Sequence, residues 1–325
     1  MKENLYPIKF YPLLKERIWG GSKLKSFFGK QTFGKNIGES WELSDVEGDT
    51  SIISNGPLEG KSLKDLLKSY KELLVGHKVF EQFGDKFPLL IKFIDAKKDL
   101  SVQLHPNDKL AKERHNSFGK TEMWYVMDTE KDSNLILDFK SDVTVSDYLE
   151  NLKNKTLPNI LNFEKVKKGD TYFIEVGRVH AIGAGVLLAE IQQTSDITYR
   201  IYDWDRVDVN GNSRELHTDL AVEAIDFNME KNYKVSYKRI ENNSNEMVSC
   251  PYFTTNFLPV SKSITKQNGH DSFLIYICVS GSVVFDANGF KTEVSLGETV
   301  LIPASIKDIT LHPKEHSELL EVYIK

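Results

Sequence analysis

Alternation of apolar and polar residues dominates this chain and predicts short β-strands. In the run SVQLHP, Val102 and Leu104 are apolar, and Gln103 and His105 alternate with them. Successive side chains of a strand point to opposite faces, so the apolar pair faces a core and the polar pair shares the other face. Pro106 is expected to end this strand because it has no backbone N–H to donate.

The same pattern predicts a mainly β fold with few helices. Short apolar runs punctuated by glycine favour a β-sandwich or barrel. The expected strands include 89–94, 171–176, 186–191, 273–278 and 299–302. The expected helices cover 63–70, 108–112, 145–152 and about 215–224. Ser62 is the expected cap of the first helix and Thr144 that of the third.

An internal repeat indicates that the β unit is duplicated. Residues 169–180 align with residues 297–308, and each copy has a turn glycine, an acidic residue, an apolar strand and a second turn. The second copy has Asp308 where the first has His180, so the second unit is expected to have lost a ligand. The polar stretch 241–246 is the expected linker. We therefore predict a metal-binding domain over 1–240 and a degenerate one over 241–325.

Composition and charge narrow the function classes. The chain has 325 residues, 40% of them hydrophobic and 27% charged, which is ordinary for a globular protein. A net charge of −5 argues against nucleic-acid binding, although clustered lysines and arginines would still accept an anionic substrate. Two cysteines, no apolar signal segment and no apolar run of about 18 residues predict a cytoplasmic protein without a membrane span.

Candidate metal ligands occur in three separate segments. Gln103 and His105 share a strand face, Glu122 lies in KTEMWY, and His180 lies in GRVHAI. One amide oxygen, one carboxylate and two imidazoles suit a borderline divalent cation that leaves room for a substrate. The residue types alone would permit zinc, manganese, cobalt or iron.

Several segments carry a resemblance to a known family. Gly169, Gly177 and His180 fit a motif of the cupin superfamily, with Glu175 in place of its proline. More specifically, the chain resembles the type I mannose-6-phosphate isomerases. The matching segments are IWGG at 18–21, GESWE at 38–42, LSVQLHPND at 100–108, KTEMWY at 120–125 and QTSDITYRIYDW at 193–204. Residues beyond about 245 match at the level of the fold alone.

This resemblance implies two cupin-type, jelly-roll-like β-barrels, with the helices attached to the first. It also implies a bound zinc ion and interconversion of mannose 6-phosphate and fructose 6-phosphate. The implied metal ligands are Gln103, His105, Glu122 and His180, and the implied catalytic arginine is Arg200. The expected partner is a small sugar phosphate, and the chain is expected to be a monomer or a homodimer.

Aldose–ketose isomerisation also needs a base and stabilisation of the negative enediolate. Arg200 would stabilise or orient the enediolate oxygens. Lys120 shares a strand face with Glu122 and would act as base, proton shuttle or phosphate partner. Glu190 is the alternative base. Lys92 and Ser101 are the candidates for binding the phosphate group.

Simpler interpretations of these residues remain open at this point. Glu122 would pair with Lys120 or Arg178, Arg200 with Asp203 or Asp205, and Lys92 would extend to the end of the barrel. Glu190 would be a structural hydrogen-bond acceptor. Two other functions compete with the isomerase, a non-catalytic sugar-binding regulatory cupin and an iron-dependent oxygenase.

Overall fold

The computed structural model describes residues 4–31, 34–207, 210–228 and 232–325. The chain divides into two compact units, and neither is continuous in sequence. The central unit comprises residues 14–39 and 93–234, and the C-terminal unit comprises residues 1–13, 40–92 and 235–325.

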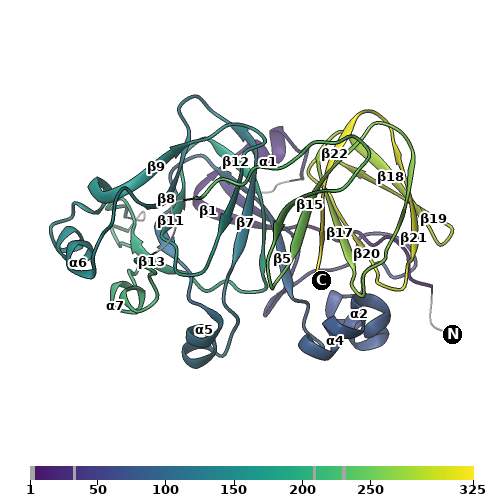
Figure 1. Ribbon diagram of the computed structural model, residues 1–325, viewed down its shortest axis with the longest axis horizontal. Coiled ribbons are helices and arrows are strands. Elements are labelled where there is room, and N and C mark those ends of the chain that lie inside the picture. Colours follow the sequence, from purple (N-terminus) through teal and green to yellow (C-terminus); the bar gives the residue numbers. More distant parts are fainter. Residues whose placement is uncertain (1–3, 32–33, 208–209, 229–231) are drawn as a thin grey trace. The chain divides into compact units, whose positions relative to one another are not determined.

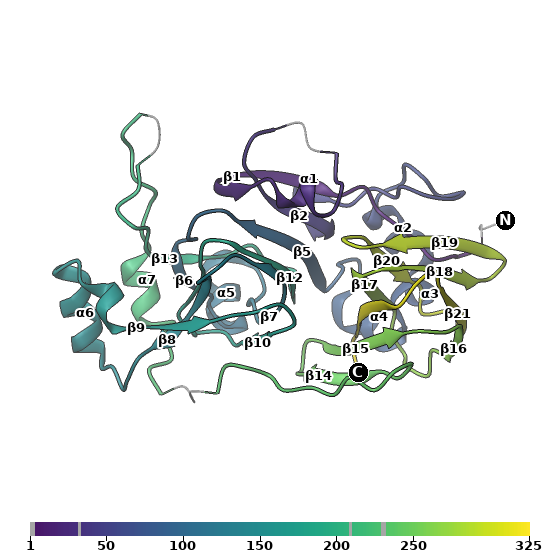
Figure 2. The same ribbon diagram turned by 90° about the horizontal axis from the view of Figure 1, so that it is seen from above.

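The central unit is built on two sheets, which Figure 2 shows facing each other. The first has the order β1 (Leu13–Gly21), β2 (Ile37–Leu43), β5 (Leu89–Ala96), β12 (Val186–Gln193), β7 (Glu122–Thr129) and β10 (Thr171–Ile174). The second has the order β13 (Tyr199–Tyr202), β6 (Val102–Leu104), β11 (His180–Ile182), β8 (Asn134–Phe139) and β9 (Leu161–Lys165). Strands β1, β2 and β5 each contain residues of both units.

The C-terminal unit also contains two sheets, which Figure 1 labels. One has the order β14 (Asn245–Ser249), β15 (Thr254–Val260), β22 (Ser317–Tyr323), β17 (Leu274–Ser280) and β20 (Thr299–Ile302). The other has the order β16 (Ile264–Gln267), β21 (Asp308–Pro313), β18 (Ser282–Ala287) and β19 (Phe290–Ser295). A hairpin of β3 (Asp45–Val46) and β4 (Asp49–Thr50) belongs to the same unit.

The helices are short and belong to both units. The central unit holds α1 (Lys23–Ser26), α5 (Asp108–His115), α6 (Val145–Lys153), the 3-10 helix η1 (Leu157–Ile160) and α7 (Thr218–Val222). The C-terminal unit holds α2 (Leu63–Tyr70), α3 (Glu72–Val75) and α4 (His77–Phe83). Among the described residues, no helix is long and apolar enough to span a membrane.

The two units repeat one strand topology. Strand β7 pairs with β10 and β12, as β17 pairs with β20 and β22. Strand β8 pairs with β9 and β11, as β18 pairs with β19 and β21. In both copies a glycine with positive φ, Gly169 or Gly297, precedes the aligned strand, at φ 85° and 79° respectively. The predicted duplication is therefore confirmed in the strand pairing.

The repeat differs in the turn before its last strand. Asp308 begins β21 as His180 begins β11, but Asp308 is exposed and His180 is buried. The first residue of β21 that faces the core is Ile309, which is fully buried. A shift of one residue moves every side chain of a strand to its other face. Asp308 therefore does not lie on the face that His180 occupies.

Strand β6 confirms the face assignment that its alternating sequence predicted. Val102 and Leu104 pack into an outer core beneath α6 and α7, together with Tyr148 and Ala221. A second core fills the space between the two sheets of the central unit and includes Trp124. Gln103 lies on the inner face of β6, because its sequence neighbours Val102 and Leu104 both pack in the outer core.

The predicted strands lie largely within β5, β10, β12, β17 and β20, and the predicted helix at 145–152 lies in α6. The helix expected over 215–224 is shorter, since α7 covers Thr218–Val222. The expected linker is partly wrong, because β14 begins inside it. There Asn245 is buried and its Nδ2 donates to the carbonyl oxygens of Ile240 and Phe257, at 3.0 and 3.1 Å. The division into a metal-binding domain over 1–240 and a degenerate domain over 241–325 stays a prediction.

The capping box of α6 generates a stability prediction. Asp147 N–H donates to the Thr144 hydroxyl at 3.2 Å, and the Asp147 carboxylate accepts from Thr144 N–H at 2.9 Å. Thr144→Ala should lower the free energy of unfolding by about 1 kcal/mol, measured by urea denaturation. Glu150→Ala, an exposed position of the same helix, should change it by less than about 0.5 kcal/mol. Equal effects of the two substitutions would contradict the assignment.

Candidate metal centre and active site

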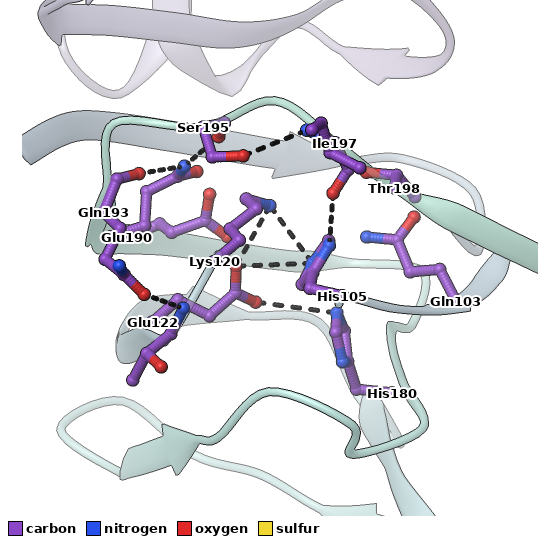
Figure 3. Close-up of polar contacts among 12 residues, drawn as sticks. Gln103, His105, Lys120, Glu122, His180, Glu190, Gln193, Ser195, Ile197 and Thr198 are labelled. Carbon is purple, nitrogen blue, oxygen red and sulfur yellow. Dashed lines mark hydrogen bonds and ion pairs between the residues drawn. The ribbon is translucent and has the colours of Figure 1, made fainter. Parts of the chain in front are cut away.

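Two imidazoles and one carboxylate converge inside the central unit. Their ligand atoms on His105, Glu122 and His180 all lie within 4.8 Å of one another, and the three residues are buried. Nε2 of His105 and Nε2 of His180 each lie 3.6 Å from one oxygen of Glu122. Figure 3 shows these side chains pointing toward one another. His180 lies in β11, His105 directly follows β6 of the same sheet, and Glu122 lies in β7 of the facing sheet.

Backbone carbonyls fix the orientation of both imidazoles. Nδ1 of His105 lies 2.8 Å from the Ile197 oxygen, and Nδ1 of His180 lies 2.9 Å from the Arg178 oxygen. A carbonyl oxygen only accepts, so Nδ1 carries a proton in both rings, and Nε2 is the nitrogen of each ring that faces the cluster. Burial lowers the pKa of His180 to about 3, which keeps its ring neutral.

This donor set fits a divalent metal ion. Nε2 of His180 is buried and makes no hydrogen bond with the described part of the chain. Metal-bound histidines usually donate their other ring N–H to a carbonyl or carboxylate, as both histidines do here. Two imidazoles and one carboxylate are ligands that zinc, iron and manganese accept. The cluster can therefore hold a metal ion.

Gln103 lies in one cross-strand row with two other candidate residues. It is opposite His180 on β11 and opposite Arg200 on β13, so the three side chains share a face of the sheet. Figure 3 shows its amide reaching toward His105, and its Oε1 lies 3.5 Å from the Ser101 hydroxyl. Gln103 as a fourth ligand stays a prediction.

Lys120 lies against the same cluster. Its Nζ is 3.0 Å from Oε2 of Glu122 and 3.2 Å from Nε2 of His105, and the residue is 5% exposed. Burial lowers the pKa of Lys120, but the Glu122 and Glu190 carboxylates outweigh it and raise the pKa above its ordinary value. The ammonium group is therefore charged, and of the two alternative partners considered for Glu122 it is Lys120 that forms the ion pair.

Glu190 faces the interior of the central unit from β12. It lies opposite Trp124 in the pairing of β12 with β7, and the Trp124 indole Nε1 donates to its Oε2 at 2.9 Å. The strand face that carries Glu190 is therefore directed inward, and its role as a base stays a prediction. Trp124 was not among the candidate site residues. Its position two residues after Glu122 in KTEMWY would have predicted that both side chains share one strand face.

Arg200 is held by neutral groups. Its Nε donates to the Ser101 hydroxyl at 3.2 Å, and its Nη1 donates to the Glu215 carbonyl at 2.9 Å. The proposed alternative partner, Asp203, instead accepts from Arg206 and Arg214. Burial, followed by the positive charge of Arg214, lowers the pKa of Arg200, although a guanidinium keeps its proton in proteins.

Lys92 lies in β5 within the C-terminal unit. It is buried, and its Nζ is 4.9 Å from the centre of the Trp41 ring, a cation–π contact. The alternative that Lys92 extends to solvent at a barrel end is therefore wrong. Its role toward a phosphate group stays a prediction.

Comparison with known proteins gives a consistent result over most of the chain. A model of the family "Phosphomannose isomerase type I, catalytic domain" matches residues 8–152, and a model of "Mannose-6-phosphate isomerase, cupin domain" matches residues 243–323. The mannose-6-phosphate isomerase ManA of Bacillus subtilis is 34% identical over 309 residues, which cover 94% of this chain and 95% of that protein. This chain belongs to the type I mannose-6-phosphate isomerase family.

Other members of the family agree in sequence and in structure. The mannose-6-phosphate isomerase of Streptococcus mutans is 29% identical over 93% of both chains. The crystal structure of mannose 6-phosphate isomerase from Bacillus subtilis superposes with a TM-score of 0.88 at 31% identity, over 98% of this chain and 99% of that one. The predicted mainly β, cupin fold and the predicted family are thereby confirmed.

The histidine geometry generates a prediction about metal content. His180→Ala removes one of the three residues that could together hold a metal ion, so the purified variant should retain much less divalent metal after dialysis than the wild type does. Metal per chain would be measured by inductively coupled plasma mass spectrometry. His312→Ala, in the C-terminal unit, should retain the wild-type metal content. Full metal content in the His180 variant would contradict the site.

Proposed function

We propose that this protein interconverts mannose 6-phosphate and fructose 6-phosphate through an enediol intermediate. The observation that carries the proposal is the buried cluster of His105, Glu122 and His180 beside Lys120, in a chain of the type I mannose-6-phosphate isomerase family. We propose zinc as the ion, held by these residues together with Gln103. Zinc suits this set of nitrogen and oxygen donors.

The difficult step of the reaction is removal of a proton from the carbon beside a carbonyl group. When bound, the ion would polarise the sugar oxygens and stabilise negative charge on them. Lys120 and Arg200 add fixed positive charges toward the same oxygens, and each is anchored by contacts with the protein before substrate binds. Preorganised charges of this kind lower the barrier without further rearrangement.

Glu190 is the proposed general base, and Lys120 is proposed to donate and shuttle protons between the substrate oxygens. A carboxylate accepts a proton readily, whereas the ammonium group of Lys120 is a donor held charged by its neighbours. The 2.9 Å hydrogen bond from Trp124 fixes the position of Glu190 within the interior. These two assignments divide the roles that the sequence left open.

Arg200 and Ser101 are proposed to position the substrate. The Ser101 hydroxyl lies within 3.5 Å of both the Arg200 side chain and the Gln103 amide, so it connects a proposed ligand with a cationic group. Arg200 would orient the enediolate oxygens through its planar donors. Lys92 and Ser101 are proposed to bind the phosphate group. A cytoplasmic location and a monomeric or homodimeric state stay predictions.

Turnover of the wild-type protein tests the proposal directly. Zinc-loaded protein should convert mannose 6-phosphate in an assay coupled to glucose-6-phosphate formation, and a chelator should abolish the conversion until zinc is restored. A folded, zinc-loaded protein without turnover would instead favour the non-catalytic sugar-binding cupin. Oxygen uptake by iron-loaded protein would favour an oxygenase, since two histidines and one carboxylate also form the iron site of that class.

Arg200→Ala separates the role of this arginine from metal binding. The variant should lose roughly a hundredfold in kcat, because a charge that stabilises the transition state is removed, while its zinc content remains near one per chain. Steady-state kinetics and metal analysis of one preparation would measure both quantities. Arg239→Ala, at an exposed arginine of the C-terminal unit, serves as the matched control. Loss of zinc from the Arg200 variant would show that the assignment is wrong.

A further inference from the structure

We propose that Trp124 is a positioning residue that acts through Glu190, an inference that rests on the proposed isomerase function. The indole Nε1 donates to Oε2 of Glu190 at 2.9 Å. Both residues are buried, Trp124 at 1% and Glu190 at 3% exposure. A hydrogen bond to a buried carboxylate is stronger than one in water, so this contact restricts where the carboxylate lies.

Trp124 also contacts a metal ligand. Its ring meets the His180 ring edge to face, with the ring centres 5.4 Å apart and the planes at 79°. Trp124 lies two residues after Glu122 on β7, so both side chains face the interior. One rigid side chain therefore spans the distance between the proposed base and the metal cluster. This arrangement sets the position of the Glu190 carboxylate relative to any sugar held at the cluster.

The C-terminal unit contains a counterpart of this pair. Tyr276 lies opposite Glu321 in the pairing of β17 with β22, as Trp124 lies opposite Glu190 in the pairing of β7 with β12. The Tyr276 hydroxyl donates to Oε2 of Glu321 at 2.8 Å. Glu122 lies opposite Ile174, the last residue of β10, and Leu274 lies opposite Ile302, the last residue of β20. Leu274 is therefore the counterpart of Glu122.

The counterpart is embedded in a structural network. The Glu321 carboxylate also accepts from Asn256 Nδ2 at 3.0 Å, from the Ser244 hydroxyl at 2.6 Å and from Lys266. Among the described residues, the candidate metal cluster of histidines and acidic residues lies in the central unit alone. The Tyr276 pair therefore provides a matched control, in which the same kind of donor is removed from a buried glutamate outside the active site.

The test compares Trp124→Phe with Tyr276→Phe in the zinc-loaded, full-length protein. Trp124→Phe removes the N–H donor and keeps an aromatic ring, so kcat should fall roughly tenfold to a hundredfold while KM changes by less than about twofold. Zinc content should stay at the wild-type level. Tyr276→Phe should lower the midpoint of urea unfolding but leave kcat within about twofold of wild type.

A double-mutant cycle distinguishes positioning from general loss of structure. If Trp124 acts through Glu190, then Trp124→Phe in the Glu190→Gln background should lower kcat by less than about twofold further. Multiplication of the two single losses in the double variant would overturn the inference, as would wild-type kcat or loss of zinc in Trp124→Phe. If that variant does not fold, benzothienylalanine at position 124, in which sulfur replaces the N–H, gives the same comparison.

The outcomes also separate this inference from the proposed function. Wild-type protein that folds and holds zinc but has no turnover would overturn the isomerase function, and this inference with it. Active wild-type protein with an equally active Trp124→Phe variant would overturn the inference alone. A selective fall in kcat that disappears in the Glu190→Gln background supports it.

Discussion

The buried carboxylate of Glu122 imposes the main constraint on the central unit. The residue is 0% exposed, and an ionised carboxylate in a protein interior costs several kcal/mol unless positive groups surround it. Lys120 supplies one positive charge at 3.0 Å, but Glu190 adds a second negative charge that also acts on Lys120. Two neutral imidazoles contribute lone pairs and no charge. Among Glu122, Glu190 and Lys120 the negative charges outnumber the positive one, and a divalent cation would offset the difference.

The two units share one strand topology but fill the space between their sheets with different residues. In the central unit the space between the sheets holds Glu122 and His180, whereas the corresponding inward positions of the C-terminal unit hold Leu274 and Ile309. The C-terminal unit thus closes its interior by apolar packing and needs no ion for that purpose. One buried acid of this unit, Glu321, is paired with Lys266 instead.

Alternating sequence predicted the parts of the site that depend on strand faces. Gln103 lies in β6 and Glu122 in β7, whereas His105 directly follows β6 and Lys120 lies two residues before β7 begins, so the alternation extends just beyond both strands. Other features leave no side-chain signal, such as the Ile197 carbonyl that orients His105. The outward face of Asp308 depends on the backbone path between β20 and β21, which has the same length as the turn between β10 and β11 and so leaves no gap in the alignment. The inclusion of residues 40–92 in the C-terminal unit depends on long-range backbone bonds, for example Ala304 N–H to the Leu74 carbonyl at 2.9 Å.

Glu190 and Glu321 are both buried, but the groups that donate hydrogen bonds to them differ in charge. This difference affects how well each carboxylate can act as a base. Burial raises the pKa of Glu321, but its pairing with Lys266 and its other hydrogen bonds outweigh burial and leave the pKa below its ordinary value. A carboxylate held in this way is a weak base. Trp124 holds Glu190 with a neutral N–H, and the positive charge that acts on Glu190 comes from Lys120, whose hydrogen bond goes to Glu122 instead. The hydrogen bond from Trp124 therefore fixes the geometry that a general base requires without adding a further positive charge to the carboxylate.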